Sequence, residues 1–400
     1  MQTIAIIKEG KIPHDNRTPL SPKQCQEFKN KNPGVDVVTE WSAVRCYSDE
    51  DYQHIGITVA EDISTTDLLI GIKEVPIDML IPGKTYMFFS HTHKKQLYNK
   101  ELLKAILKKN ITLIDYELIT DEKGTRLLGF GRWAGIIGAH YALKMYGKKK
   151  NLYQLKPAVQ CLNLQEMVDQ YEYIDFPAIK IAITGGGKVA NGAIEIMDKA
   201  GILEVTTREY KNQSFNHPVF TVLHSEHLYS KEGEINFNKK DFYAHPELYT
   251  SRFSEYVGIT DVLINAMFWS PQAPRLFEKE ALTENFKIMC IADVSCDVDG
   301  SVPLTTRVTY SDDPIFGYHL NTGIQGKPYL DDTIDIMAVT NLPNELPKDS
   351  SKDFGRMLMK VLAKYVETEG KSPVFERATI AKNGKLTESF SYLQQYLDQD

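Results

Sequence analysis

Residues 179–202 read IKIAITGGGKVANGAIEIMDKAGI, and this stretch decides the fold. The apolar run 179–184 has the length of a buried strand, and Gly185, Gly186 and Gly187 follow it directly. A helix is predicted over residues 193–200, with Gly192 at its start. Glycines between a strand and a helix let backbone N–H groups and the positive helix end approach a pyrophosphate. The order predicts a dinucleotide-binding domain; the spacing is looser than GxGxxG, and an ordinary strand–helix turn is the alternative.

Length and composition set the class of protein. Four hundred residues predict about two domains, and 42% apolar with 25% charged residues is typical of a globular protein. The net charge of −7 disfavours non-specific binding to nucleic acid or to anionic membranes. There is neither a signal-peptide pattern nor an apolar run of about 18 residues. The cysteines are widely spaced, which predicts reduced thiols and a cytoplasmic location; they are Cys25, Cys46, Cys161, Cys290 and Cys296.

The rest of the chain alternates predicted strands with predicted helices, which indicates parallel sheets covered on both faces. We therefore predict an α/β fold with two Rossmann-like domains. Residues 1–145 plus about 325–400 would form the substrate and catalytic domain, and about 146–324 the dinucleotide-binding domain. Residues 206–255 look irregular and are interpreted as an insertion. Strands are expected at 3–7, 35–39, 68–72, 85–89, 111–114, 262–268 and 288–294, and helices at 22–30, 94–109, 133–145 and 351–366.

Two residues of the first domain are candidates for proton transfer. Lys73 follows the apolar run LLIGI, and His91 follows TYMFF, so both come at the carboxyl ends of predicted parallel strands. A desolvated lysine loses its proton more easily, and a histidine exchanges protons near neutral pH. Amine and imine chemistry needs such a pair. The alternative is a surface lysine with a core histidine, and nearby His93 is interpreted as a bystander rather than a metal ligand.

Other candidates follow from position in the same way. Arg17, in the loop after the first strand, is suited to clamp a substrate carboxylate, and Glu117 ends another strand. Glu209, 22 residues beyond Gly187, is our candidate for the adenosine ribose. Arg208 beside it would instead accept a 2′-phosphate, so the choice between NAD and NADP stays open.

Several long segments carry a resemblance to a known family. The chain resembles the saccharopine dehydrogenase (L-lysine-forming) family, and within it the lysine–2-oxoglutarate reductase domain of the bifunctional aminoadipate semialdehyde synthases. That group is related to alanine dehydrogenase and nicotinamide nucleotide transhydrogenase. The segments are KTYMFFSHTHKKQ, LIDYELITDEKGTRLLGFGRWAG, HPELYTSRF, LINAMFW, ADVSCDVDGSVPLTT and NLPNELPKDSSKDFG, in this order.

The resemblance implies an active site in a cleft between two Rossmann-type domains. It implies reversible reductive condensation of L-lysine with 2-oxoglutarate to saccharopine, using NAD or NADP. Lys73 and His91 match the catalytic pair and Arg17 the carboxylate-binding arginine. The alternatives are a related amino-acid or opine dehydrogenase, such as alanine dehydrogenase, and a catalytically silent dinucleotide sensor. Oligomeric state stays open. Further substrate-site residues would be Lys94, Glu117 and Phe130, and further cofactor-site residues Val189, Asn265 and Ser295.

Overall fold

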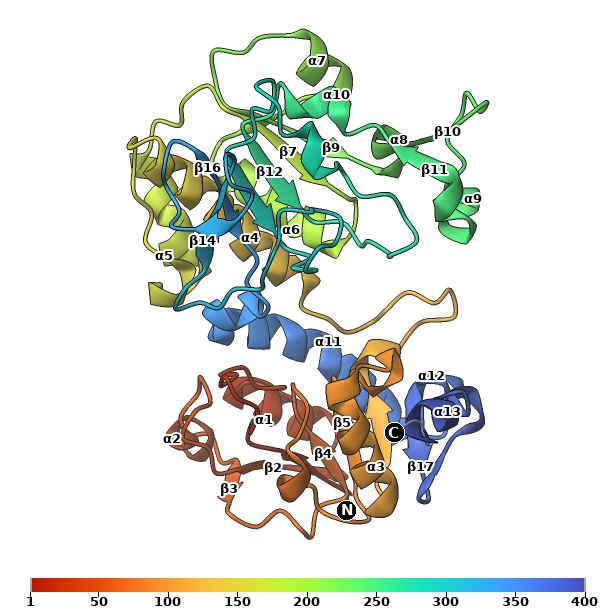
Figure 1. Ribbon diagram of the computed structural model, residues 1–400. Helices are drawn as coiled ribbons and strands as arrows, with labels where there is room; N and C mark the ends of the chain where they lie inside the picture. The colour runs from red at the N-terminus through yellow and green to blue at the C-terminus, as the bar shows by residue number, and fades with distance from the viewer. Residues whose placement is uncertain (1, 399–400) are drawn as a thin grey trace. The chain divides into compact units, whose positions relative to one another are not determined.

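The computed structural model describes residues 2–398, which divide into two compact units (Figure 1). Unit 1 comprises Met1–Phe130 and Pro347–Asp400, and unit 2 comprises Gly131–Leu346. The boundaries differ from those expected near 145 and 325, because both positions fall inside elements of unit 2. Helix α4 (Gly131–Lys149) packs on that unit's own core, and β15 (Gln325–Gly326) pairs with β14 (Ile315–His319).

Unit 1 is built on an eight-stranded sheet. The six strands from β6 to β3 are parallel, and β17 and β18 add an antiparallel edge. In spatial order the strands are β18 (Lys385–Leu386), β17 (Thr379–Lys382), β6 (Thr112–Asp115), β5 (Thr85–Phe88), β4 (Leu68–Ile70), β1 (Gln2–Ile6), β2 (Val35–Glu40) and β3 (Thr58–Ala60).

Helices cover both faces of this sheet, as alternation of buried side chains along parallel strands requires. Ile4 and Ile70 pack with α1 and α11 on one face, whereas Ala5 and Leu69 pack with α3 and α13 on the other. Because α11 and α13 come after unit 2 in the sequence, the chain leaves unit 1 and later returns to it. The helices are α1 (Pro22–Lys31), α2 (Asp49–Gln53), α3 (Lys100–Lys108), α11 (Pro347–Thr368), α12 (Pro373–Ala378) and α13 (Leu393–Asp398).

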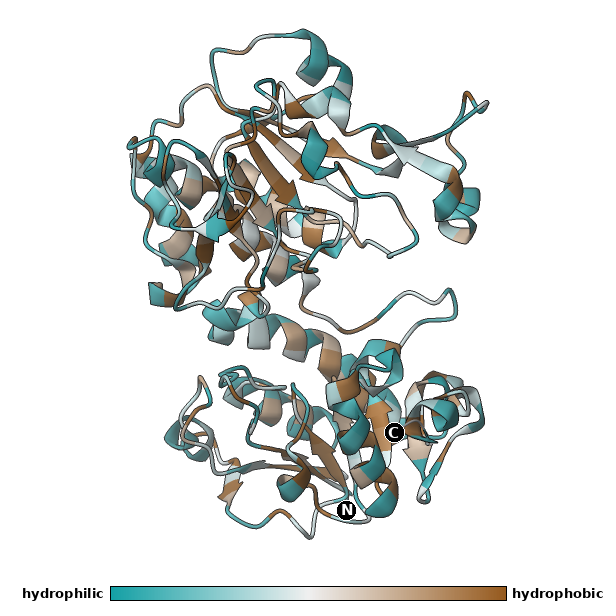
Figure 2. Ribbon diagram, viewed as in Figure 1, coloured by the Kyte–Doolittle hydropathy of each residue, from teal (hydrophilic) through white to brown (hydrophobic). Residues whose placement is uncertain are grey.

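Unit 2 has a second eight-stranded sheet, again mostly parallel with an antiparallel edge formed by β14 and β15. Its central strands are fully buried and carry the hydrophobic colour in Figure 2. The prediction of two Rossmann-like α/β domains is confirmed. The order is β15, β14, β16 (Thr333–Met337), β13 (Cys290–Asp293), β12 (Val262–Asn265), β7 (Lys180–Thr184), β9 (Val219–Leu223) and β8 (Leu203–Glu204).

Helices flank this sheet too, and a separate two-stranded hairpin extends from it (Figure 1). Helices α4 and α6 pack on one face, and the aromatic residues of α7 and α10 pack on the other. The hairpin strands are β10 (Tyr229–Lys231) and β11 (Tyr249–Ser251). The remaining helices are α5 (Leu164–Asp169), α6 (Lys188–Lys199), α7 (Thr207–Asn212), α8 (Ser225–Leu228), α9 (Lys239–Ala244) and α10 (Ser254–Val257).

Several segments differ from their predicted structure, among them the helix expected over 193–200, which begins at Lys188. Residues 206–255, expected to be irregular, contain β9, which is buried along its whole length and lies next to β7. Its apolar run VFTVL was short, and the polar residues around it masked the strand. The helix expected from residue 94 begins at Lys100, because residues 92–99 form two short 3-10 turns instead.

Within residues 2–398, no helix combines the length and the apolar character that crossing a membrane requires. None of the five cysteines, all of which lie within the described residues, forms a disulfide.

Candidate functional site

The two predicted catalytic residues and two of the predicted substrate-binding residues follow four neighbouring strands of unit 1. Strands β6, β5, β4 and β1 lie side by side and run parallel, so their carboxyl ends meet at one edge of the sheet. Lys73 follows β4, His91 follows β5, Glu117 follows β6, and Arg17 lies in the loop after β1. This edge is where open α/β sheets place ligand groups.

Lys73 is partly buried, and its backbone is held by Glu9 from the loop after β1. The Glu9 carboxylate accepts the N–H groups of Ile72 and Lys73 at 2.6 and 2.9 Å. The Lys73 ammonium takes part in none of the hydrogen bonds or ion pairs found among residues 2–398. Burial, followed by the nearby positive charge of Arg17, lowers the pKa of Lys73. An amine in such surroundings is suited to accept a proton.

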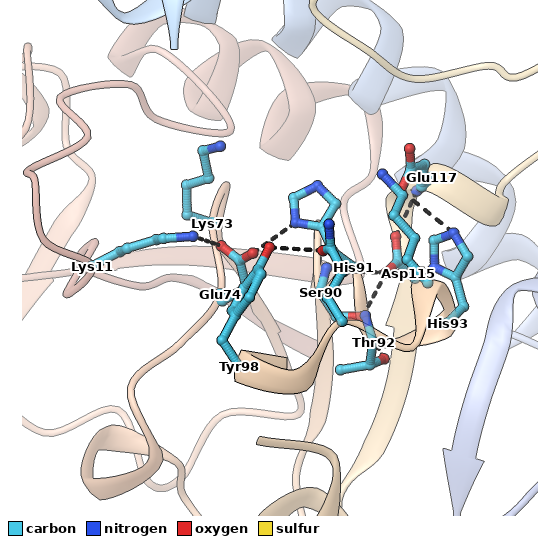
Figure 3. A network of polar contacts seen from close by, with 12 residues as sticks. Lys11, Lys73, Glu74, Ser90, His91, Thr92, His93, Tyr98, Asp115 and Glu117 are labelled. Atoms are coloured by element: carbon cyan, nitrogen blue, oxygen red, sulfur yellow. Dashed lines mark hydrogen bonds and ion pairs between the residues drawn. The ribbon is translucent and has the colours of Figure 1, made fainter. Parts of the chain in front are cut away.

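Glu74, the next residue along the chain, connects Lys11 with His91. Its Oε1 lies 2.6 Å from His91 Nδ1, and its Oε2 accepts from Lys11 Nζ at 2.7 Å (Figure 3). Burial alone would raise the pKa of Glu74, but the His91 and Lys11 contacts outweigh it and lower the pKa to about 2. An ionised Glu74 orients the imidazole and favours a proton on Nδ1. Glu74 was not among the residues predicted from the sequence, although its place directly after Lys73 was a usable signal.

His91 adopts a left-handed backbone conformation, with φ 54° and ψ 7°. Residues other than glycine rarely do so, and they cluster where function constrains the chain. Asp115 holds this turn: its Oδ2 accepts from the Ser90 N–H and hydroxyl at 3.0 and 2.5 Å, and from the His91 N–H at 3.2 Å. Asp115 is fully buried and was also missed, because its role depends on the pairing of β5 with β6.

Arg17 is buried and pairs with Asp15 through two parallel hydrogen bonds, at 2.9 Å from Nε and 2.5 Å from Nη2. Its guanidinium carbon lies 4.1 Å from the centre of the Phe130 ring, which stacks at 4.6 Å on Phe354 of α11. The structure therefore brings Arg17 and Phe130 together. An acidic partner on the guanidinium fork means that a substrate carboxylate would meet an Asp–Arg pair rather than an isolated cation.

Lys94 and Glu117 also meet, with Lys94 Nζ 2.9 Å from Glu117 Oε2. Arg126 binds the other oxygen of Glu117 at 2.8 Å. Burial would raise the pKa of Glu117, but these cations outweigh it and lower the pKa. His93, Asp115 and Glu117 offer ligand atoms within 4.8 Å of one another, the spacing of a metal site. Two cations on Glu117 oppose the binding of a further cation there.

The glycine loop of unit 2 borders a cavity of about 620 Å³. Gly185 has φ +93°, and a side chain there would lie 2.9 Å from the Ala266 carbonyl oxygen, so the turn needs glycine. Gly186, Gly187 and Val189 line the same cavity, and α6 begins at Lys188. The loop thus has the arrangement that a pyrophosphate requires: strand, open backbone, helix N-terminus.

Gly192 has a different task. A Cβ on Gly192 would lie 2.0 Å from the Arg132 carbonyl oxygen, and one on Gly135 would lie 1.8 Å from the Val189 carbonyl oxygen. The two glycines therefore let the backbones of α4 and α6 touch. This contact sets the position of α6, and with it the loop that precedes it.

Asn265 and Ser295 lie in one buried network at the carboxyl ends of β12 and β13. Asn265 accepts from the Thr184 hydroxyl at 2.8 Å and donates to Asp293 at 2.8 Å. Ser295 donates to the same Asp293 oxygen at 2.7 Å. Burial, although opposed by these hydrogen bonds, raises the pKa of Asp293. Neither Asn265 nor Ser295 borders the 620 Å³ cavity.

Glu209 lies away from the strand end where it was expected. It occupies the first turn of α7, and its carboxylate accepts from the Thr206 N–H and hydroxyl at 2.9 and 2.7 Å. The strand beside β7 is β9, whereas β8, which precedes Glu209, lies at the sheet edge. Residues after β9, including His224 and Ser225, line the cavity instead. The expected distance of about 20 residues assumed that the next strand in sequence is also the next in space.

Two family profiles match the chain in order. One described as alanine dehydrogenase/PNT, N-terminal domain, covers residues 5–137, and one described as alanine dehydrogenase/PNT, C-terminal domain, covers residues 174–389. An alpha-aminoadipic semialdehyde synthase of Arabidopsis thaliana is 30% identical, over 98% of this chain and 41% of its own length. A saccharopine dehydrogenase (NAD(+), L-lysine-forming) of Emericella nidulans is 25% identical, over 89% of this chain and 90% of its own length. The chain spans less than half the length of the synthases it matches.

Solved structures show the same fold. An L-alanine dehydrogenase superposes with a TM-score of 0.64 at 15% identity, covering 99% of both chains. A transhydrogenase from Sinorhizobium meliloti superposes with a TM-score of 0.61 at 16% identity, covering 96% of this chain and 100% of the other. The prediction of an oxidoreductase with a nicotinamide cofactor is thereby confirmed at the level of the family. Because the two profiles together cover most of its length, the chain belongs to the alanine dehydrogenase/PNT family.

Proposed function

We propose that the chain catalyses the reversible reductive condensation of L-lysine with 2-oxoglutarate to saccharopine. The observation that carries the proposal is the arrangement around Lys73: an amine with a lowered pKa, beside a carboxylate that holds His91. Amine–carbonyl condensation needs one group to accept the proton of the attacking ammonium and another to deliver protons to the departing water. A relative named saccharopine dehydrogenase (NAD(+), L-lysine-forming), at 25% identity, supports lysine and saccharopine as reactants.

In this proposal Lys73 is neutral when the substrates bind and takes the proton of the lysine ammonium. The freed amine adds to the ketone carbon, and His91 donates a proton to the carbinolamine oxygen, which leaves as water. Glu74 is a positioning residue that keeps His91 oriented through Nδ1. Loss of water leaves a protonated imine, and a bound dinucleotide would supply the hydride that reduces its carbon to the secondary amine.

Substrate carboxylates are assigned to the cations at the same strand ends. Arg17 and Lys94 are the two candidates, and Glu117 is the candidate for the substrate's second ammonium. Phe130 provides an apolar wall beside Arg17. The cofactor-site residues remain those of the glycine loop with Val189, Asn265 and Ser295. A cytoplasmic location also stays a prediction.

A related amino-acid dehydrogenase is the second candidate, since the fold matches an L-alanine dehydrogenase over the whole chain. The same acid–base pair would serve ammonia as well as an amine. A catalytically silent sensor is disfavoured because Lys73, Glu74 and His91 are all in place.

A single assay separates these candidates. Nicotinamide oxidation is followed with lysine plus 2-oxoglutarate and, in parallel, with ammonia plus pyruvate. We expect turnover with the first pair, and Lys73→Met to lower it by about 100-fold or more. His91→Gln should lower it too, because the proposed proton donor to the carbinolamine oxygen is lost. Lys104→Met, on the exposed face of α3, is the matched control. If the enzyme turned over ammonia and pyruvate but not lysine and 2-oxoglutarate, the proposed substrates would be wrong.

A further inference from the structure

Residues 91–96 form a turn, called here the His91 turn, that carries two of the candidate site residues. His91 and Lys95 both adopt left-handed backbone conformations, with φ of 54° and 57°. Within the turn, the Lys94 N–H donates to the His91 carbonyl oxygen at 3.1 Å, and the Lys95 N–H donates to the Thr92 carbonyl oxygen at 3.4 Å. Two such residues so close together are unfavourable for side chains with a Cβ, so the turn persists only where surrounding groups hold it.

Two tyrosines from the end of the chain hold the later part of this turn. The Tyr392 hydroxyl donates to the His93 carbonyl oxygen at 3.3 Å, and the Tyr396 hydroxyl donates to the Gln96 carbonyl oxygen at 2.5 Å. These two carbonyl groups lie on either side of Lys94 in the sequence. The tyrosines therefore fix the backbone from which the Lys94 side chain extends.

The segment that carries the tyrosines docks on α3 through apolar contacts. Leu393, Tyr396 and Leu397 of α13 are buried, and they belong to the same hydrophobic core as Leu103 and Ile106 of α3. Because α3 follows the His91 turn closely in the chain, this packing brings the tyrosine hydroxyls to the turn.

The contacts of Tyr392 are directed at the turn rather than at the core. Its side chain is 45% exposed, so the ring contributes little to apolar burial. Lys95 Nζ lies 5.0 Å from the centre of that ring, within the range of a cation–π contact. Tyr392 thus contacts the turn twice, through its hydroxyl and through its ring face. The family profile ends at residue 389, so both tyrosines lie beyond the segment that it matches.

We propose that Tyr392 and Tyr396 are positioning residues, which hold the His91 turn so that the Lys94 ammonium is directed at a substrate carboxylate. The inference rests on the proposed function in taking Lys94 as a carboxylate-binding group. Lys94 pairs with Glu117 at 2.9 Å, so a substrate carboxylate must compete for its ammonium. A backbone that is already fixed lowers the conformational entropy that is lost when the substrate binds.

The two parts of the turn are held by different groups. Asp115 accepts the His91 N–H at 3.2 Å, and Glu74 lies 2.6 Å from the His91 ring nitrogen Nδ1. Neither contact involves a tyrosine. Loss of the tyrosine hydroxyls should therefore weaken substrate binding and leave the acid–base step nearly intact.

The first test measures the turn itself and needs no turnover. Amide hydrogen exchange of Lys94 and Lys95 is followed in the wild type and in Tyr392→Phe/Tyr396→Phe, since phenylalanine keeps the ring and loses only the hydroxyl. Both amides should exchange about 3- to 10-fold faster in the double variant, whereas the amides of β5 should be unchanged. Gln395→Ala, on the exposed side of α13, is the matched control. Unchanged exchange of both amides in the double variant would overturn the proposal.

The second test separates KM from kcat, with lysine and 2-oxoglutarate as substrates. The double variant should raise KM for 2-oxoglutarate by about 5- to 10-fold and change kcat by less than about twofold. A fall in kcat with unchanged KM would mean that the hydroxyls act on His91 instead, and would overturn the proposal. A loss of thermal stability with both kinetic constants unchanged would show that the tyrosines only attach α13 to α3, which would overturn it too.

Failure of the two proposals can be told apart. If lysine and 2-oxoglutarate gave no turnover but the two amides exchanged faster in the double variant, only the proposed reaction would fall. If turnover were found and neither exchange nor KM changed, the reaction would stand and the positioning role of the tyrosines would fall.

Discussion

Glu9 shows how a single carboxylate can constrain a reactive lysine. It accepts two backbone N–H groups from Ile72 and Lys73, and so ties the loop after β1 to the end of β4. Its surroundings nonetheless disfavour a negative charge. Desolvation, with the nearby charge of Asp15, outweighs the two hydrogen bonds and raises the pKa of Glu9 to about 8. Holding Lys73 in place therefore has a cost that depends on pH.

The sign of that dependence follows from the raised pKa. The pKa of Glu9 is near 4.5 in the unfolded chain and about 8 in the folded protein. At a pH between these two values, the folded protein therefore binds one proton that the unfolded chain has lost. The contribution of Glu9 to stability is fully present below about pH 4.5 and is lost as the pH rises through 8. We expect the wild type to lose stability relative to Glu9→Gln across this range. Urea unfolding of both proteins at several pH values checks this, and a constant difference would contradict it.

At the scale of elements, the glycines near the start of α6 have different surroundings. Gly192 lies in the close contact between α4 and α6, whereas Gly187 lies in the loop that precedes α6. A Cβ at Gly192 would meet the Arg132 carbonyl oxygen at 2.0 Å, whereas a Cβ at Gly187 meets nothing within 4 Å. Gly187 is also the N-cap of α6, with φ −93°, which other residues adopt readily. Two glycines of one motif therefore differ: Gly192 is needed for close helix packing, whereas Gly187 borders open space in the cavity.

Substitution separates these two demands. Gly187→Asp should fold normally, since aspartate is a favourable N-cap, but should weaken dinucleotide binding by about tenfold or more through charge repulsion. Gly187→Ala is the uncharged control. Gly192→Ala should instead destabilise unit 2 by about 1–3 kcal/mol, since overpacking outweighs the roughly 1 kcal/mol gain in helix propensity. Thermal unfolding and nicotinamide fluorescence report the two effects. Unchanged affinity in Gly187→Asp would mean that the loop only connects strand and helix.

At the scale of the whole molecule, unit 1 is completed by a segment that follows unit 2 in the chain. Helix α11 inserts Phe354, Leu358 and Leu362 into the core under β1 and β4, and all three are fully buried. Strand β17 then pairs with β6 at the edge of the same sheet. Phe354 also stacks on Phe130 beside Arg17, so the returning segment contributes to the surroundings of the candidate site.

The returning helix should therefore govern the stability of unit 1. Leu358→Ala removes a fully buried side chain and should cost about 2–5 kcal/mol. Lys360→Ala, on the exposed side of α11, should change stability by less than about 0.5 kcal/mol. Urea unfolding measured by hydrogen exchange assigns the loss to a unit. Equal effects of the two substitutions would show that α11 is not part of the core.

The local sequence by itself determined the positions of many strands, of the glycine loop and of the residues that follow the strands. Apolar runs of strand length located β1, β2, β4, β5 and β6 of unit 1 and β7, β12 and β13 of unit 2, because burial on both faces leaves an uninterrupted hydrophobic signature. The position of Lys73 and His91 after two such runs was enough to bring them to one sheet edge. The glycine loop was equally visible, since strand, turn and helix are contiguous in residues 179–202. Recognition of the family drew on the same contiguous segments.

Only the tertiary structure decided which distant segments meet. Strand order is set by long-range pairing, so nothing local indicated that β9 rather than β8 lies beside β7, or that Glu209 lies on α7 rather than at the end of that neighbouring strand. Glu9, Glu74 and Asp115 acquire their tasks from partners up to 64 residues away. The return of α11 to unit 1 likewise depends on a core that assembles from both ends of the chain. Such contacts form because buried groups need partners, and the fold alone determines which partners are within reach.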